Sequence, residues 1–452
     1  MERLKKNSRI YLMFAYVFLF LVNSFYPWEF IQYSMVISIF LIFLVVFPDV
    51  KNSNKILSMA LFILGTYILV KSNAGLKDLV RAFTENAGII TLLLTVPLLS
   101  IILHYDDYAE GILELAEKYI TSNFSFYTIT VFIVNGLGMI LNLATIPLVY
   151  QLMEKTSQYY PQKLYYKALT RGFCTNLMWS PNFVSVAVVL HYLKIPWYKI
   201  APLGLLLAIV GNLLGIVIER LSRKEPDVRL LVSSHKEGTY ASRKRYSYKL
   251  IGLIAFFIFY IIFLELCIDQ SVLVTVPLVS FTAPLILALI LKKMGIFKEK
   301  FRDYLHVSLP GMHNEVFLFT AIGFLGYALR ISNIGQYIVA LINRLGFNSA
   351  SSLIPLLLTV IALLSLIGVH PIISISTVAV TLPVGTLPLT ELQMAVTLLA
   401  GYLLYLILSP FSALSLIMTG ITKESPLEVS IKLNFAYGVS FAVVTSLILS
   451  LL

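Results

Sequence analysis

Residues 135–147 read NGLGMILNLATIP, and residues 170–185 read TRGFCTNLMWSPNFVS. Each stretch lies inside a longer apolar run that has the length of a membrane span, and each contains residues unsuited to a continuous helix. Asn, Gly and Pro interrupt the first run, and Trp-Ser-Pro-Asn at 179–182 interrupts the second. Because proline removes a backbone donor and clashes with the preceding turn, the two runs predict broken helices instead of simple spans.

The composition around these stretches indicates a membrane protein. The chain has 452 residues, of which 58% are hydrophobic and 13% are charged, whereas a soluble domain carries roughly 25% charged residues. Apolar runs of spanning length fill nearly the whole sequence, and a chain of this kind needs lipid as its solvent. We therefore expect an all-α polytopic membrane protein that has membrane lipid as a partner.

Basic residues are concentrated in one polar stretch. The chain has a net charge of +11, and residues 220–249 hold nine of its 34 Lys and Arg. Such a stretch can bind nucleic acid, but a cytoplasmic linker beside anionic headgroups explains it more simply. We expect no nucleic-acid partner, and we place the protein in the cytoplasmic (inner) membrane as a multi-pass protein with a cytoplasmic N-terminus.

The two halves of the sequence show the same features in the same order. Asn86 and Asn314 open spans, Gly138 and Gly368 lie in interrupted regions, and Ser-Pro pairs at 180–181 and 409–410 break the spans that follow. Internal repeats of this kind are common in transporters. We expect an extra transmembrane helix at 1–30, a first repeat at 31–219, the linker at 220–249 and a second repeat at 250–452.

The positive-inside rule then decides the topology. If the interrupted regions 126–153 and 351–388 are re-entrant hairpins, most Lys and Arg lie in the cytoplasm; if only the first region spanned, the linker would move outside, against the rule. The expected fold is about eleven transmembrane helices plus two re-entrant hairpins. The two repeats then have opposite orientations, which is an inverted-repeat transporter architecture.

Broken helices at membrane depth expose backbone groups that can bind a solute. Freed N–H groups at a half-helix N-terminus suit an anion, and freed carbonyls suit a cation. A simple proline kink in a packed helix is the alternative for each break. We predict that substrate is bound by short polar side chains at the hairpins and breaks: Asn142, Thr145, Ser180, Asn182, His370, Ser374, Ser409 and Ser412.

Ion coupling is expected at the hairpins, from Asn135, Gly138, Gly368 and His370. His370 lies beside Pro371 in an apolar run, and its ordinary pKa of about 6.5 would let it carry a coupling proton. A neutral histidine bonded to a backbone carbonyl is the other interpretation. Arg171 could draw an anion, although a cytoplasmic anchor is the simpler interpretation.

The chain resembles the ion transporter superfamily, especially the divalent-anion:sodium symporter group. The residues that carry the resemblance are Asn135 to Gly138, Asn142, Thr145, Thr175-Asn176, Trp179 to Asn182, Ser365 to Ser376 and Ser409 to Ser412. The resemblance implies two hairpins, Na⁺ as a coupling ion and a homodimer. The symporter group also has Ser-Asn-Thr at each hairpin tip, which this sequence lacks, so H⁺ and Na⁺ both stay open.

The expected function is secondary transport of a small, anionic organic solute, and not an enzymatic reaction. One alternative is a polytopic enzyme, a polymerase or ligase acting on lipid-linked glycans. Another is the membrane subunit of a transporter that works with a binding protein. The sequence shows no phosphate-binding loop, zinc motif or nucleophile elbow. We therefore expect no metal site and no cofactor other than Na⁺ as a coupling ion.

Overall fold

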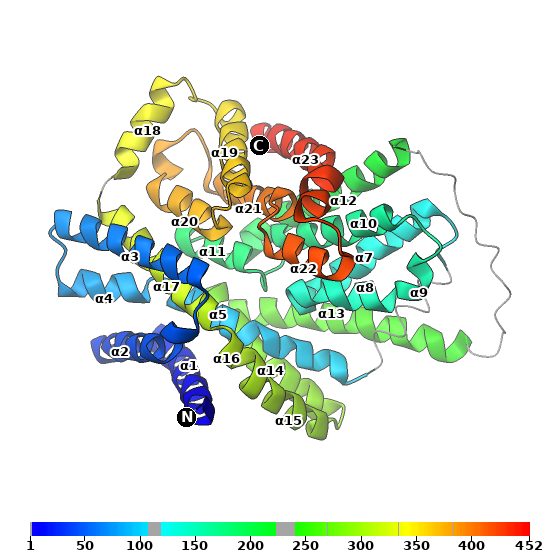
Figure 1. The fold of residues 1–452 in the computed structure, drawn as a ribbon, viewed down its shortest axis with the longest axis horizontal. Coiled ribbons are helices and arrows are strands. Elements are labelled where there is room, and N and C mark those ends of the chain that lie inside the picture. Colours follow the sequence, from blue (N-terminus) through cyan, green and yellow to red (C-terminus); the bar gives the residue numbers. More distant parts are fainter. Residues whose placement is uncertain (1, 107–118, 223–239, 269, 333, 383) are drawn as a thin grey trace. The chain divides into compact units, whose positions relative to one another are not determined.

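A computed structural model describes residues 2–106, 119–222, 240–268, 270–332, 334–382 and 384–452. Its described part contains helices and no strand (Figure 1). Ten of these helices are long and apolar enough to cross a membrane. The protein is therefore an all-α polytopic membrane protein, as the composition predicted. Residues 107–118, and residues 223–239 of the linker, lie outside the described residues.

The helices form two compact units, each made of separate parts of the chain. Unit 1 holds residues 1–105, 263–347 and 376–387, and unit 2 holds residues 106–262, 348–375 and 388–452. Each unit draws on both predicted repeats. Compact units and sequence repeats are different ways to divide a chain, so the inverted repeat stays a prediction.

Unit 1 is built around α17 (His313–Ile331), which packs against α3 (Asn52–Lys71), α4 (Leu76–Thr84) and α5 (Ala87–Thr95). Asn86 closes this core, since its Nδ2 donates to the carbonyl of Phe319 at 3.0 Å. The remaining helices of unit 1 are α1 (Glu2–Phe25), α2 (Glu29–Val46), α14 (Val272–Ile290), α15 (Met294–Asp303), α16 (Leu309–Gly311) and α18 (Ile334–Arg344).

Unit 2 has α21 (Glu391–Leu408) at its centre, with every residue from Gln393 to Leu408 buried. The helices that surround it are α7 (Asn123–Leu141), α8 (Thr145–Leu152), α9 (Glu154–Ser157), α10 (Gln162–Thr175), α11 (Val184–Leu193), α12 (Trp197–Leu221), α19 (Ala350–Leu366), α22 (Ala413–Thr422) and α23 (Leu433–Ser450). Two helices, α13 (Tyr240–Ile268) and α20 (Pro371–Thr381), have residues in both units.

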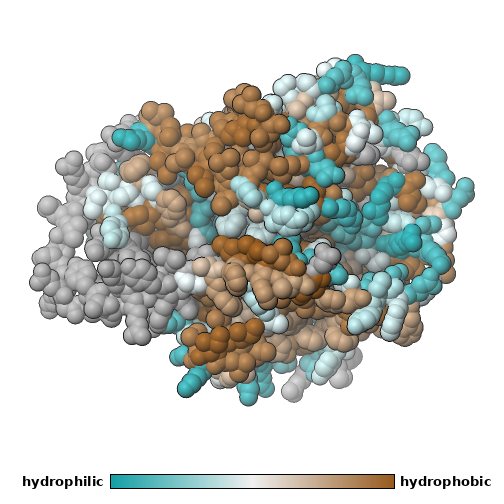
Figure 2. Space-filling model, turned by 180° about the vertical axis from the view of Figure 1, so that it is seen from behind, coloured by the Kyte–Doolittle hydropathy of each residue, from teal (hydrophilic) through white to brown (hydrophobic). Residues whose placement is uncertain are grey.

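Large apolar side chains cover the outer faces of both units. Phe30, Leu44 and Ile63 in unit 1 are each at least two-thirds exposed, and Phe132 and Leu447 in unit 2 are more than half exposed. Figure 2 shows that hydrophobic residues form broad areas on one side of the protein. A surface of this kind is stable in hydrocarbon and not in water, which supports the assignment to a membrane.

Candidate functional site

The first interrupted region folds into a helical hairpin. The chain runs along α7, turns at Asn142 and returns along α8 (Figure 1). The Thr130 hydroxyl lies 3.7 Å from the sulfur of Met153, and these residues are almost equally far along the chain from the turn. Asn142 has a φ of +53°, and its Oδ1 accepts the N–H of Leu143 at 2.8 Å. Its ψ of −137° lies outside the left-handed helical region that asparagine commonly adopts, so the backbone at the tip is unusual for a residue with a side chain.

The first Ser-Pro pair breaks a helix where the sequence predicted. Helix α10 ends at Thr175, a single 3₁₀ turn follows at Asn176–Met178, and α11 begins at Val184. Helix α12 approaches this break closely, because a Cβ on Gly204 would collide with the carbonyl oxygen of Met178. The Trp197 indole N–H donates to the Trp179 carbonyl at 2.7 Å. These two contacts hold the irregular backbone of the break against α12, which is itself a continuous helix.

The hairpin packs directly onto this break. The Asn182 Nδ2 donates to the carbonyl of Met139 at 2.9 Å, close to the hairpin tip. Gly138 faces Asn176, and a Cβ at this position would collide with the Asn176 amide nitrogen. Of the predicted residues, the structure therefore places Gly138 of the first hairpin and Asn182 of the first break at the contact between these two elements. It also adds Asn176, which the sequence analysis had included only in the family resemblance.

Four buried oxygen atoms in this region have no hydrogen-bond partner among the described residues. They are Thr145 Oγ1, Asn176 Oδ1, Ser180 Oγ and Asn182 Oδ1. All four residues are at most 1% exposed. A buried polar group without a partner costs about 1–3 kcal/mol. Four such groups in one hairpin and one break indicate a site that a ligand, an ion or water completes.

The chemistry available at the first break is neutral. Two amide oxygens can only accept hydrogen bonds or contact a cation, while the two hydroxyls can donate or accept. The first turn of α11 adds free backbone N–H groups, since its N-cap residue Phe183 makes no side-chain cap. Backbone N–H groups at a helix start favour a negatively charged group. The site therefore offers oxygen ligands for a cation beside donors for an anion.

The Asn135 side chain, on α7, contacts two further helices, α10 and α12. Its Nδ2 donates to the carbonyl of Gly172 at 3.0 Å and to that of Val131 at 2.9 Å. Its Oδ1 accepts from Thr175 and from Asn212, both at 3.3 Å. In this conformation Asn135 positions α7, α10 and α12.

The second Ser-Pro pair also breaks a helix, between α21 and α22. The serine hydroxyls at this break have hydrogen-bond partners. The Ser409 hydroxyl donates to the Ser365 carbonyl at 2.7 Å, and Ser412 donates to the carbonyl of Leu406 at 2.8 Å. Ser412 also caps α22 by accepting the N–H of Ser415 at 3.1 Å. Both side chains therefore stabilise the break. These hydrogen bonds give Ser409 and Ser412, which were both predicted to bind substrate, a structural role.

The second interrupted region breaks between α19 and α20. Gly368 has a φ of +81° and lies against Phe411 of the second break. His370 is partly buried just before α20, where its Nδ1 accepts the N–H of Ile372 at 3.4 Å. Ser374 is buried within α20. The second interrupted region is thus joined to the second break by the contacts of Gly368 and Ser365.

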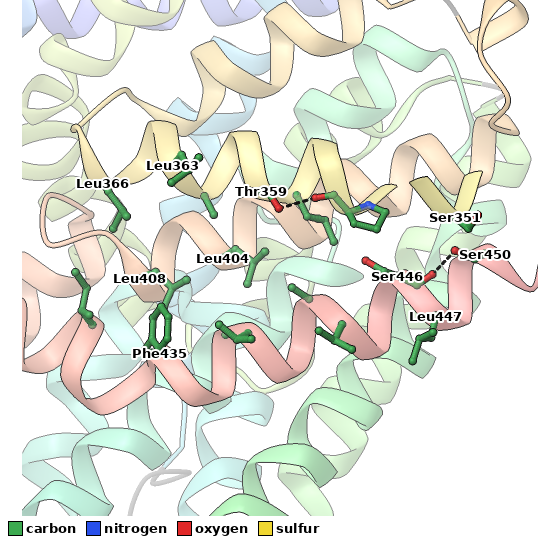
Figure 3. A pocket seen from close by; sticks show the side chains of 18 residues that line it. Ser351, Thr359, Leu363, Leu366, Leu404, Leu408, Phe435, Ser446, Leu447 and Ser450 are labelled. Carbon is green, nitrogen blue, oxygen red and sulfur yellow. Dashed lines mark hydrogen bonds between the residues drawn. The ribbon is translucent and has the colours of Figure 1, made fainter. Parts of the chain in front are cut away.

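An apolar groove of about 560 Å³ lies elsewhere in unit 2, among α19, α21 and α23. Apolar side chains, leucine above all, line most of it, and Ser351, Ser446 and Ser450 lie toward one end (Figure 3). The Ser450 and Thr359 hydroxyls donate to backbone carbonyls in their own helices. None of the predicted site residues lines this groove, and its apolar lining is unsuited to a charged solute.

Neither a family model nor a curated protein matches the chain. The fold therefore defines a class, the helical polytopic membrane proteins. Within the described residues, no three His, Cys, Asp or Glu side chains are grouped so that they could hold a metal ion. The assignment of a function rests on the geometry of the first break.

Proposed function

We propose that this protein is a secondary active transporter for a small, anionic organic solute, coupled to H⁺ or Na⁺. The observation that carries the proposal is the group of four unpaired, buried oxygens at the first hairpin and the first break. Irregular backbone at membrane depth is tolerated only where it is buried in protein or lines a cavity. Unsatisfied polar groups at such a break are expected where a solute binds and leaves.

The oxygen atoms favour Na⁺ as the coupling ion at the first break. Asn176 and Asn182 each have an unpaired amide oxygen, and Thr145 contributes a hydroxyl from the hairpin tip. Unwound backbone and neutral oxygens coordinate Na⁺ in broken-helix transporters. The α11 N-terminus and Ser180 would then bind the anionic group of the solute. The bound Na⁺ and the bound anion would balance each other's charge in a site whose own groups are neutral.

A thermal-shift measurement on purified protein tests this proposal. Ligands that bind only the folded state raise its melting temperature by mass action. We expect organic anions to raise the melting temperature more in NaCl than in choline chloride. A panel of mono-, di- and tricarboxylates that gives no shift under any condition, across pH and with either cation, would contradict transport of an organic anion.

His370 provides the test of proton coupling. If H⁺ is the coupling ion, His370→Gln should remove the pH dependence of transport in proteoliposomes, because glutamine cannot titrate. If Na⁺ is the coupling ion, the variant should keep both its pH profile and its sodium dependence.

We further propose that the protein is a homodimer in the inner membrane, with its N-terminus in the cytoplasm.

A further inference from the structure

Three basic residues form one line along α10 toward the first break. Lys163, Lys167 and Arg171 are spaced four residues apart, and Thr175 continues the line to the end of the helix. Side chains at this spacing share one helix face. Their exposed fractions fall from 64% at Lys163 through 22% at Lys167 to 3% at Arg171. The positive charges therefore lead from the surface toward buried residues next to the break.

Arg171 is the innermost of these charges, and each nitrogen of its guanidinium group donates a hydrogen bond. Its Nη1 donates to Glu219 at 2.9 Å, its Nε donates to Asn434 at 3.0 Å, and its Nη2 donates to the Leu433 carbonyl at 3.0 Å. The structure thus places Arg171 in the interior of unit 2, where three helices meet. A surface anchor would not need this set of partners.

Each carboxylate along the line is shared by two cations. Glu219 accepts from Arg171 and from Lys167, at 2.9 and 3.0 Å. Glu428 accepts from Lys163 and from Lys432, at 2.9 and 3.0 Å. A buried ion pair adds little net stability because desolvation opposes it. Glu219 alone neutralises Arg171, so that need does not explain why Lys167 also donates to this carboxylate.

Tyr437 adds a further polar group beside Arg171. Its ring centroid is 5.0 Å from the guanidinium carbon. The hydroxyl is buried and has no hydrogen-bond partner among the described residues. The ring that packs on Arg171 therefore carries a buried hydroxyl that is left over for another molecule.

We propose that Arg171 and Lys167 form an anion-binding station on the route to the first break, and that Glu219 occupies it until a substrate carboxylate takes its place. Glu219 supplies the same chemical group that an organic anion would bring, with one oxygen on each cation. Thr175, one turn beyond Arg171, contacts Asn135 and so connects the station to the hairpin. The inference rests on the proposed function for its role in transport, but binding at the station can be tested separately.

Chemical rescue tests the station itself. Glu219→Ala removes the carboxylate and leaves Arg171 buried without it, so the melting temperature of purified protein should fall by several degrees. Formate or acetate should fit the vacated space and restore most of the loss, with saturation. Chloride at equal ionic strength should restore little. Equal recovery with all three salts would reflect screening alone and would overturn the proposal, as would no recovery with any of them.

Glu428→Ala is the matched control, because Glu428 also bonds two cations but its partner lysines are 64% and 70% exposed. Exposed ion pairs contribute little, so this variant should keep its melting temperature and show no rescue by formate. A saturable rescue as large as that of Glu219→Ala would show that any paired carboxylate behaves in this way, which would count against a specific station.

Transport by Lys167→Gln tests the role of the station. This variant keeps the Arg171–Glu219 pair, so it should remain folded, but its transport at limiting substrate should fall about tenfold through a raised KM. Normal transport by a folded Lys167→Gln protein would overturn the role in the route. If the wild-type protein transports no organic anion, the proposed function fails instead, and the formate rescue still decides whether the station binds carboxylates.

Discussion

Thr145 and Thr397 are both completely buried in unit 2, but only one of their hydroxyls has a hydrogen-bond partner among the described residues. Thr397 donates to the Gln393 carbonyl at 2.7 Å, while the Thr145 hydroxyl has no partner among the described residues. Valine has nearly the shape of threonine and lacks the hydroxyl. Comparing the two valine variants therefore separates a hydroxyl that serves the fold from one that serves a ligand.

We expect Thr145→Val to keep or raise the melting temperature, since removing an unsatisfied buried group relieves its desolvation cost. The same change should weaken transport about tenfold to hundredfold at limiting substrate, because a hydrogen bond to a charged ligand is worth about 1.5–3 kcal/mol. Thr397→Val should lose about 1 kcal/mol of stability and transport normally. A Thr145→Val protein that is unstable but fully active would assign this hydroxyl to the fold.

The two broken helices differ at the level of elements, although both contain Ser-Pro. Ser180 is buried with an unpaired hydroxyl, whereas Ser409 donates to Ser365. Ser409→Ala leaves the Ser365 carbonyl without this donor, so its melting temperature should fall, whereas that of Ser180→Ala should not. Ser180→Ala should lose transport instead. Thermal unfolding and uptake assays on both variants check this contrast, and a larger stability loss in Ser180→Ala would contradict it.

Close packing of the first hairpin on the first break depends on Gly138. A Cβ at this position would collide with the Asn176 amide nitrogen, so Gly138→Ala should displace the Asn176 side chain at the break and reduce transport. Gly420 in α22 has open space around it. Gly420→Ala should therefore raise helix stability by about 0.5–1 kcal/mol and leave transport unchanged. Unchanged transport in Gly138→Ala would show that this contact does not shape the site.

Proline and glycine positions made the helix breaks predictable from the sequence, because their effect on the backbone is local. Both Ser-Pro breaks occur where the pattern placed them, and the turn at Asn142 lies within the predicted interrupted region 126–153. The bonding state of each side chain was not predictable. Ser180 and Ser409 occupy similar sequence contexts, and only the approach of the Ser365 carbonyl distinguishes them. The partly buried amide of Asn212 and the buried amide of Asn434 were missed for the same reason, since their partners come from distant helices.

At the scale of the whole molecule, apolar composition was sufficient to predict a helical membrane protein. The two compact units were not predictable, because each combines segments more than a hundred residues apart. Hydropathy describes how a residue interacts with lipid, and it does not specify which helix packs on which. The core positions of α17 and α21 depend on such contacts, as does the position of Arg171 inside unit 2.

Membrane orientation is a property of the whole chain that charge and span number determine together. The basic stretch 220–249 should lie in the cytoplasm under the positive-inside rule, and eleven spans would then place Leu452 outside. Single cysteines at Ser234 and at Leu452 test this with a membrane-impermeant thiol reagent on intact cells. Cys267 is exposed and should first be changed to serine, while Cys174 is buried and should not react. We expect labelling at position 452 and, only after the cells are opened, at position 234.

Labelling of position 234 in intact cells would reverse the orientation and remove the charge argument for two re-entrant hairpins. Labelling of neither position until lysis would give an even number of spans, which would require one of the two interrupted regions to cross the membrane completely.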